Sequence, residues 1–169
     1  MQLKCQREVA TGKGYAVFNH NTEAMITVNG YPDGRGGYKH QFTYTMDMNT
    51  IISVINQSSS CKQSTHATCQ GVIFVSRGYT WLNGRVGQKL AYWGGGPSDG
   101  IGCACGITNS CVNNYYKCNC DINEDGVIYA DSGDVTNKEV LPLTGIAVGD
   151  TQSSAEILYY TIGPLKCVI

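Results

Sequence analysis

Five of the nine cysteines fall within eighteen residues, in the stretch CACGITNSCVNNYYKCNC at 103–120. Cysteines at this density either bind a metal or form disulfides. Structural zinc sites commonly use Cys-x2–4-Cys pairs, whereas a single residue separates Cys103 from Cys105 and Cys118 from Cys120. The three histidines all precede this stretch and have no ligand spacing. The spacing therefore favours disulfides.

A single-residue spacing makes each close pair a poor candidate for bonding to itself, so these thiols should reach more distant cysteines. The cysteines expected in disulfides are Cys61, Cys69, Cys103, Cys105, Cys111, Cys118, Cys120 and Cys167. Cys61 and Cys69 flank KQSTHAT, a loop that one bridge could close, and a bridge from Cys167 would pin the C-terminus. The pairing of Cys167 with the five clustered cysteines stays open. Cys5 is left over, either free or paired outside this chain.

Disulfides on this scale indicate an oxidising, extracellular compartment. The sequon Asn56-Gln57-Ser58 agrees, since it predicts glycosylation of Asn56. A formal net charge of −1 gives no reason to expect nucleic acid or an anionic membrane as a partner. No apolar run approaches the ~20 residues that cross a bilayer, so we expect no direct membrane insertion. The N-terminal residues lack the apolar core of a secretory signal, so a secreted chain would be a fragment of a longer protein.

Apolar patterning predicts an α+β fold carried by an antiparallel sheet with few short helices. Strands are expected at 14–21, 24–30, 38–45, 71–75, 79–96 (a hairpin at Asn83-Gly84), 146–151 and 156–163. A helix is expected at 47–58, because Asp47 can cap it and Met48, Ile51, Ile52 and Ile55 share one face. The chain is expected to form one domain over 1–169. Within it we distinguish a sheet-rich part at 12–93, an irregular disulfide-stapled loop part at 94–140, and closing strands at 141–167.

The sequence DINEDG at 121–126 begins like a calcium loop, with oxygen-bearing side chains at positions one, three and five and glycine at six. The candidate calcium ligands are Asp121, Asn123, Asp125 and Asp131. Position twelve is Ser132 in place of the usual glutamate. Several carboxylates within fourteen residues would repel one another if packed together, and a bound cation would relieve that repulsion. If the carboxylates point into water, no ion is needed.

Two serine motifs suggest a hydrolase, and neither has the required context. GPSDG at 96–100 matches a nucleophile elbow, but every histidine precedes Ser98 and Pro97 adjoins it. ADSGDV at 130–135 lacks flanking glycines. We therefore expect no enzymatic activity.

Aromatic residues supply the other candidate binding groups. Tyr92 and Trp93 precede three glycines, which would either leave a ring face open to a sugar or simply permit core packing. Tyr115 and Tyr116 could add amphipathic contact area.

A series of short motifs, in order along nearly the whole chain, carries a family resemblance. The motifs are FNHN (18–21), W-x-x-GR-x-G (81–87), YWGGG (92–96), CACG (103–106), CNCD (118–121), DSG (131–133), LP-x-T (141–144), GDT (149–151) and GPLKC (163–167). Taken together, the chain resembles the fibrinogen-like domain of the neurexin/contactin-associated family of cell-surface adhesion proteins. It departs from common fibrinogen domains in GKGYA (12–16) and in the short PSDG (97–100), where the family's usual ion loop is reduced.

The resemblance implies a fibrinogen C-terminal-like fold and an extracellular module that binds a protein or a glycan without catalysis. It also implies that Cys5 pairs with a cysteine upstream. The leading hypothesis is recognition of a protein partner through the Cys-rich loops. One alternative is a calcium-dependent lectin with its pocket in 92–133. Another is a structural subunit of a larger ectodomain assembly or homo-oligomer, with Cys5 bridging chains.

Overall fold

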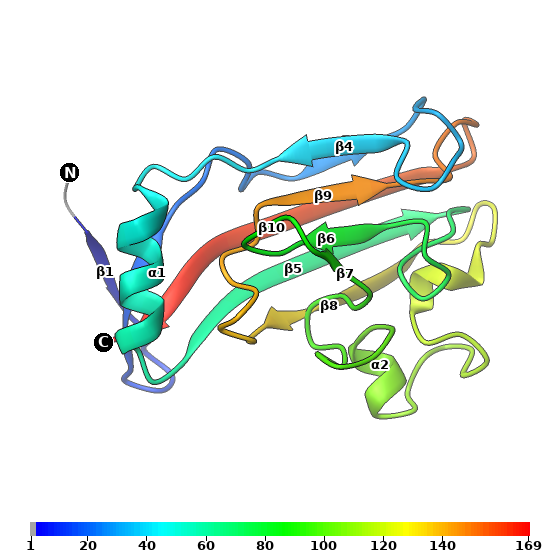
Figure 1. Ribbon diagram of the computed structural model, residues 1–169. Helices are drawn as coiled ribbons and strands as arrows, with labels where there is room; N and C mark the ends of the chain where they lie inside the picture. The colour runs from blue at the N-terminus through cyan, green and yellow to red at the C-terminus, as the bar shows by residue number, and fades with distance from the viewer. Residues whose placement is uncertain (1–2) are drawn as a thin grey trace.

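Two antiparallel β-sheets, packed as two layers, make up most of the computed structural model, which describes residues 3–169 (Figure 1). The larger sheet contains β1 (Lys4–Arg7), β2 (Gly14–Phe18), β3 (Ile26–Val28), β5 (Cys61–Gln70), β8 (Tyr129–Val135) and β10 (Ile157–Val168). Its strand order is β1-β2-β10-β5-β8, and β3 also pairs with β10. The smaller sheet contains β4 (Tyr38–Gln41), β9 (Gly145–Val148), β6 (Trp81–Asn83) and β7 (Lys89–Leu90), in that order. The α+β expectation is therefore confirmed in outline.

Three short helical elements lie beside the sheets. They are α1 (Met48–Gln57), α2 (Ala104–Ile107) and the 3-10 helix η1 (Asn119–Ile122). Asp47 caps α1 as predicted, since its side chain accepts the Thr50 N–H at 3.0 Å. None of the helices in residues 3–169 has both the length and the apolar character that a membrane crossing demands.

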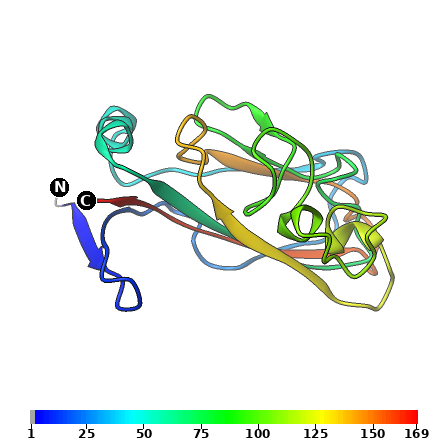
Figure 2. The ribbon, with the colours of Figure 1, turned by 90° about the horizontal axis from the view of Figure 1, so that it is seen from below.

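The core lies between the two layers, which are seen edge-on in Figure 2. Alternate side chains of the long strand β10 are buried, because successive residues of a strand point to opposite faces. Tyr160 on β10 meets Tyr38 on β4, and their hydroxyls lie 2.9 Å apart. A register shift between Ile162 and Leu165 marks a bulge in β10. The buried backbone carbonyl of Gly163 in this bulge accepts hydrogen bonds from Gln63 and His20.

The strand expected at 71–75 is wrong, although Val72, Phe74 and Val75 are buried. Gly71 adopts a positive φ of 61°, and the backbone from there to Ser76 is irregular. Carboxylates replace the strand partners, because Asp150 accepts the Ile73 N–H and Asp121 accepts the Phe74 N–H. Burial of an apolar run therefore did not require a strand at this place.

The loop expected between Cys61 and Cys69 is also wrong, because these residues form β5. Its inward positions include polar residues, and this hides the alternation that marks a half-buried strand. Gln63 and Thr65 are buried there and hydrogen-bonded. The region 94–140 is likewise less irregular than expected, since it contains α2, η1 and β8.

Candidate ligand-binding surface

Disulfides hold the Cys-rich loops against the larger sheet. The pairs are Cys61–Cys167, Cys69–Cys120, Cys103–Cys118 and Cys105–Cys111. The first joins β5 to β10, the second ties η1 to the end of β5, and the other two close loops in the segment 103–118. Within residues 3–169 the one free thiol belongs to Cys5, which is exposed on β1. Whether it pairs with a cysteine outside this chain stays a prediction.

A bridge between Cys61 and Cys69 is wrong, for a simple geometric reason. The two residues stand at opposite ends of β5, eight positions apart. A strand rises about 3.3 Å per residue, so their separation is about 26 Å, well beyond the reach of a disulfide. Each of them instead bonds a cysteine on a neighbouring element.

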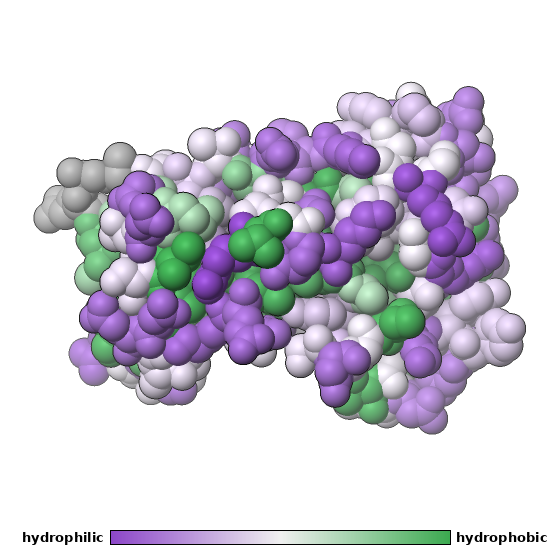
Figure 3. All heavy atoms as spheres, viewed as in Figure 1, coloured by the Kyte–Doolittle hydropathy of each residue, from purple (hydrophilic) through white to green (hydrophobic). Residues whose placement is uncertain are grey.

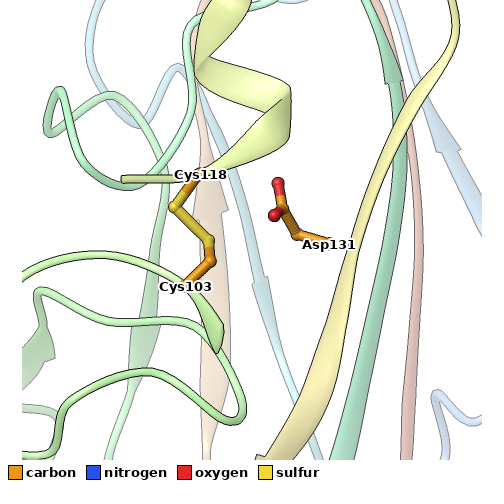
Figure 4. A group of neighbouring side chains, drawn as sticks. All are labelled: Cys103, Cys118 and Asp131. Atoms are coloured by element: carbon orange, nitrogen blue, oxygen red, sulfur yellow. A yellow bond between two sulfur atoms is a disulfide. The ribbon is translucent and has the colours of Figure 1, made fainter. Parts of the chain in front are cut away.

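Asp131 on β8 connects the larger sheet to the Cys-rich loops by hydrogen bonds. Its carboxylate accepts the backbone N–H groups of Asn119 at 3.0 Å and Cys120 at 2.8 Å. The carboxylate lies beside the Cys103–Cys118 disulfide (Figure 4). The two sulfurs are bonded to each other, so neither is a thiolate that could bind a metal. Burial raises the pKa of Asp131, while the two hydrogen bonds lower it.

The Asp121 carboxylate in η1 likewise accepts backbone hydrogen bonds, in this case from the segment before β6. Asp121 is wholly buried, and its carboxylate accepts the backbone N–H groups of Phe74 at 2.8 Å and Ser76 at 2.9 Å, together with the Ser76 hydroxyl. Burial raises the pKa of Asp121, and these hydrogen bonds oppose that rise. The carboxylate thus supplies acceptors to the irregular segment that precedes β6.

The four predicted calcium ligands are divided between interior and surface. Asp121 and Asp131 are buried and engaged with backbone N–H groups, whereas Asn123 and Asp125 are exposed. Within residues 3–169, the acidic members of this set do not form a group whose oxygens all lie within 4.8 Å of one another. Calcium binding by this loop stays a prediction.

A different carboxylate cluster forms where Asp33, Asp150 and Glu156 meet. Asp150 is buried, and its carboxylate accepts the Ile73 N–H at 2.7 Å. Burial, together with the neighbouring carboxylates, raises the pKa of Asp150 to about 6. Its backbone has a φ of 57°, in the left-handed region where Asn and Asp are tolerated.

We expect Asp150→Asn to stabilise the protein at neutral pH. Because folding raises the pKa of Asp150, its contribution to stability is complete below its unfolded pKa and is lost as the pH rises towards 6. The variant should therefore be more stable by on the order of 1 kcal/mol at pH 7 and by much less at pH 4, where the folded Asp150 carboxyl is protonated. The gain at pH 7 is limited because Asp33 beside Asp150 is exposed, so water screens the charges of the cluster. Urea unfolding across this pH range would measure the difference, with Asp99→Asn as the exposed control. An equal gain at pH 4 would contradict the electrostatic cause.

Trp93 cannot serve as the sugar platform considered from sequence. Its ring is 0% exposed, it packs against Phe74 at a centroid distance of 5.0 Å, and its indole N–H donates to the Asp131 carbonyl. Tyr92 is buried as well. A side chain on Gly94 would meet the Gly133 carbonyl, so this glycine permits close packing on β8 and opens no ring face.

Tyr115 and Tyr116 do lie at the surface, in a hollow of about 480 Å³. We name this the tyrosine hollow, and its lining residues are Ser76, Arg77, Ile101, Tyr115, Tyr116 and Lys117. Tyr115 is 85% exposed and meets Tyr116 edge to face at a centroid distance of 5.1 Å. The Arg77 guanidinium lies 5.8 Å from the centre of the Tyr116 ring. The hollow thus combines aromatic surface with positive charge.

A second hollow of about 420 Å³ lies on the smaller sheet, and sequence reasoning missed it. We name it the sheet hollow, and its lining includes Lys39, Gln41, Trp81, Asn83, Lys89 and Ala147. The Lys89 ammonium stands 3.8 Å from the centre of the Trp81 ring. The only signal in the sequence was the alternation of 38–45, which places Lys39 and Gln41 on one face.

The two hollows are connected by a smaller one of about 260 Å³, which shares residues with both. Trp81 and Lys89 also line the sheet hollow, whereas Ser76 and Ile101 also line the tyrosine hollow. The described lining of all three contains five Lys and Arg residues and no Asp or Glu. The three hollows are therefore lined by positive charge alone, although the chain as a whole has a net charge of −1.

Asn56 of the sequon is exposed in the last turn of α1. The Ser58 hydroxyl of the same sequon is partly buried and donates to the Val54 carbonyl at 2.7 Å. Glycosylation of Asn56 stays a prediction.

Comparison with known proteins finds a similarity to a neurexin. No family model matches the chain. Neurexin-4 of Drosophila melanogaster is 30% identical to it over an alignment of 171 positions, which covers 92% of this chain and 13% of that protein. The chain thus spans about an eighth of the length of this curated relative. The similarity to a neurexin agrees with the motif resemblance, and the finer assignment to a fibrinogen-like domain stays a prediction.

Proposed function

We propose that this chain is a non-catalytic extracellular recognition module, of the fibrinogen-like type, that binds a protein partner through its Cys-rich loops. Four disulfides support an oxidising, extracellular setting. The similarity to a stretch of Neurexin-4 over most of the chain supports the same setting.

The distribution of exposed apolar side chains carries the proposal. Six of the twelve large apolar side chains that are exposed in residues 3–169 lie in a short part of the Cys-rich segment, namely Ile101, Ile107, Val112, Tyr115, Val127 and Ile128. Figure 3 shows some of this apolar surface near α2, and the same view also shows apolar patches beside α1 and over the middle of the molecule. Exposed apolar groups concentrated on one region are typical of protein–protein interfaces, in which a buried apolar centre is surrounded by polar residues.

The rigidity of these loops supports a role in binding a partner. Disulfides and the two buried carboxylates fix the segment before any partner arrives. A partner then binds without ordering these loops, so less of the contact free energy is lost to conformational entropy.

The hydrogen bonds of the histidines support a non-catalytic role. His20 contacts the Gly163 carbonyl and the Thr22 N–H, and His40 contacts the Thr22 hydroxyl. His66 contacts the Thr68 hydroxyl. Among the described residues, then, no imidazole is hydrogen-bonded to a serine hydroxyl, which nucleophilic catalysis by serine would use.

Binding of the fluorescently labelled chain to cultured cells tests the proposal, with cells that bind the unmodified chain used for the variants. A triple variant with Ile107→Ser, Val112→Ser and Tyr115→Ala should lose about tenfold or more in affinity, because it removes apolar contacts from one interface. The matched control changes three exposed apolar residues elsewhere: Val9→Ser, Met25→Ser and Val86→Ser. Equal binding by the two triple variants would contradict the proposed surface.

Two treatments of the same cells separate the alternatives. Protease treatment should abolish binding, while removal of cell-surface glycans should leave it intact. Loss of binding after glycan removal and on addition of a calcium chelator would favour the lectin instead. A reducible dimer that disappears in Cys5→Ser would favour a structural subunit.

A further inference from the structure

We propose that the sheet hollow is a second binding site, whose ligand is an anionic saccharide bearing sulfate or carboxylate groups. This inference does not depend on the protein partner proposed for the Cys-rich loops, because the residues that carry it lie on the smaller sheet.

The shape of the hollow follows from the register of three strands. Ala147 on the central strand β9 pairs with Lys39 on β4 and with Trp81 on β6. Directly paired residues of adjacent strands project from the same face of a sheet. The small side chain of Ala147 therefore forms a floor between two walls of long side chains. Gly145, two residues earlier, continues this floor between Gln41 and Asn83.

Positive charge in the hollow is held in place and is not neutralised by an ion pair. Trp81 positions the Lys89 ammonium by a cation–π contact of 3.8 Å. Lys39 and Lys89 are both exposed, and neither forms an ion pair within residues 3–169. No carboxylate lies among the described lining residues. Two unpaired cations facing one hollow are complementary to an anionic ligand.

Neutral polar groups between the cations favour a saccharide as the anion. The Gln41 amide is exposed and has no hydrogen-bond partner among the described residues. Asn83 donates through Nδ2 to the Gly87 carbonyl, which leaves its Oδ1 able to accept. An amide pair beside an indole ring offers both the hydrogen-bonding groups and the apolar surface that sugar hydroxyls and C–H groups require.

The lining argues against an acidic protein segment as the ligand. None of the exposed large aliphatic side chains lines this hollow, in contrast to the Cys-rich loops. A protein interface normally has a dry apolar centre of protruding side chains, whereas of the apolar residues lining this hollow Ile146 and Ala147 are buried in the sheet and only Trp81 offers a large side chain. The volume of about 420 Å³ falls within the range of roughly 300–1,000 Å³ that is usual for small-ligand sites.

Titration of the protein with a heparin-derived tetrasaccharide and a hyaluronan-derived tetrasaccharide tests the proposal and separates sulfate from carboxylate recognition. The readout is the indole N–H resonance in a 15N-labelled sample, because the chain has two tryptophans and Trp93 is wholly buried. An anionic tetrasaccharide should shift the Trp81 resonance and leave that of Trp93 unmoved. Neutral maltotetraose should shift neither.

Paired variants locate the site. Lys39→Gln with Lys89→Gln should weaken binding about tenfold or more, because two charge-assisted contacts are lost. Lys4→Gln with Lys13→Gln makes the same change of charge at exposed positions outside the hollow and should alter affinity less than about twofold. An unchanged Trp81 resonance, equal weakening by both pairs, or equally tight binding of an octaglutamate peptide would overturn the proposal.

Discussion

Removal of the Cys61–Cys167 disulfide, by changing both cysteines to alanine, should lower the free energy of unfolding by about 4 kcal/mol. The bridge joins residues 106 positions apart and so restricts the unfolded chain over most of its length. Loss of this restriction raises the entropy of the unfolded state, whereas β5 and β10 keep their backbone hydrogen bonds. Urea unfolding followed by tryptophan fluorescence would measure the change.

The Cys105–Cys111 pair provides a matched comparison within the same molecule. It spans only six positions, so its removal should lower the free energy of unfolding by about 2 kcal/mol. Both double variants replace two cysteines with alanine. A larger loss from the short bridge would show that native contacts, and not the entropy of the unfolded chain, decide how much each disulfide stabilises this fold.

Elements defined by local signals were predicted well. The helix at 48–57 follows from Asp47 as a cap and from isoleucines at helical spacing, and both signals lie within twelve residues. The pairing of β6 with β7 was also predicted, but its turn was not: Asn83 lies in β6 opposite Lys89, and the strands are joined by the longer loop 84–88. Such information is present in any short window of sequence.

Two segments were misjudged because their structure depends on partners far along the chain. β5 was missed because Gln63 and Thr65 face the core, where the bulge of β10 and strand β8 supply their partners. The segment 71–75 was misread because buried acceptors come from Asp121 and Asp150, which lie about fifty and seventy-seven positions further along the chain. Neither relationship is visible until the sheet topology is known.

The same distinction applies to the binding surface. Tyr115 and Tyr116 were offered from sequence as contact area, and both line the tyrosine hollow; their role in binding stays a prediction. Lys39 and Lys89 lie fifty positions apart, and only the pairing of β4, β9, β6 and β7 brings them to one hollow. Trp93 was offered as a ligand platform from its glycine neighbours, but those glycines serve close backbone packing.

Asp121→Ala should lower the free energy of unfolding by about 3 kcal/mol, the largest effect expected of a single substitution in the Cys-rich half. The change removes the acceptor of the backbone N–H groups of Phe74 and Ser76, which have no other partner among the described residues. Phe74 is fully buried, so water cannot replace the carboxylate there. Part of this loss is offset, because the buried charge and its desolvation disappear as well.

Asp125→Ala is the control that separates this structural role from calcium binding. Asp125 belongs to the same predicted ligand set but is exposed, so its replacement should change stability by less than about 0.5 kcal/mol. Unfolding measured in EDTA and in excess calcium then distinguishes the two causes. A carboxylate that binds backbone N–H groups predicts the same large loss for Asp121→Ala in both buffers. A loss that appears only with calcium, and is shared by Asp125→Ala, would instead assign Asp121 to an ion site.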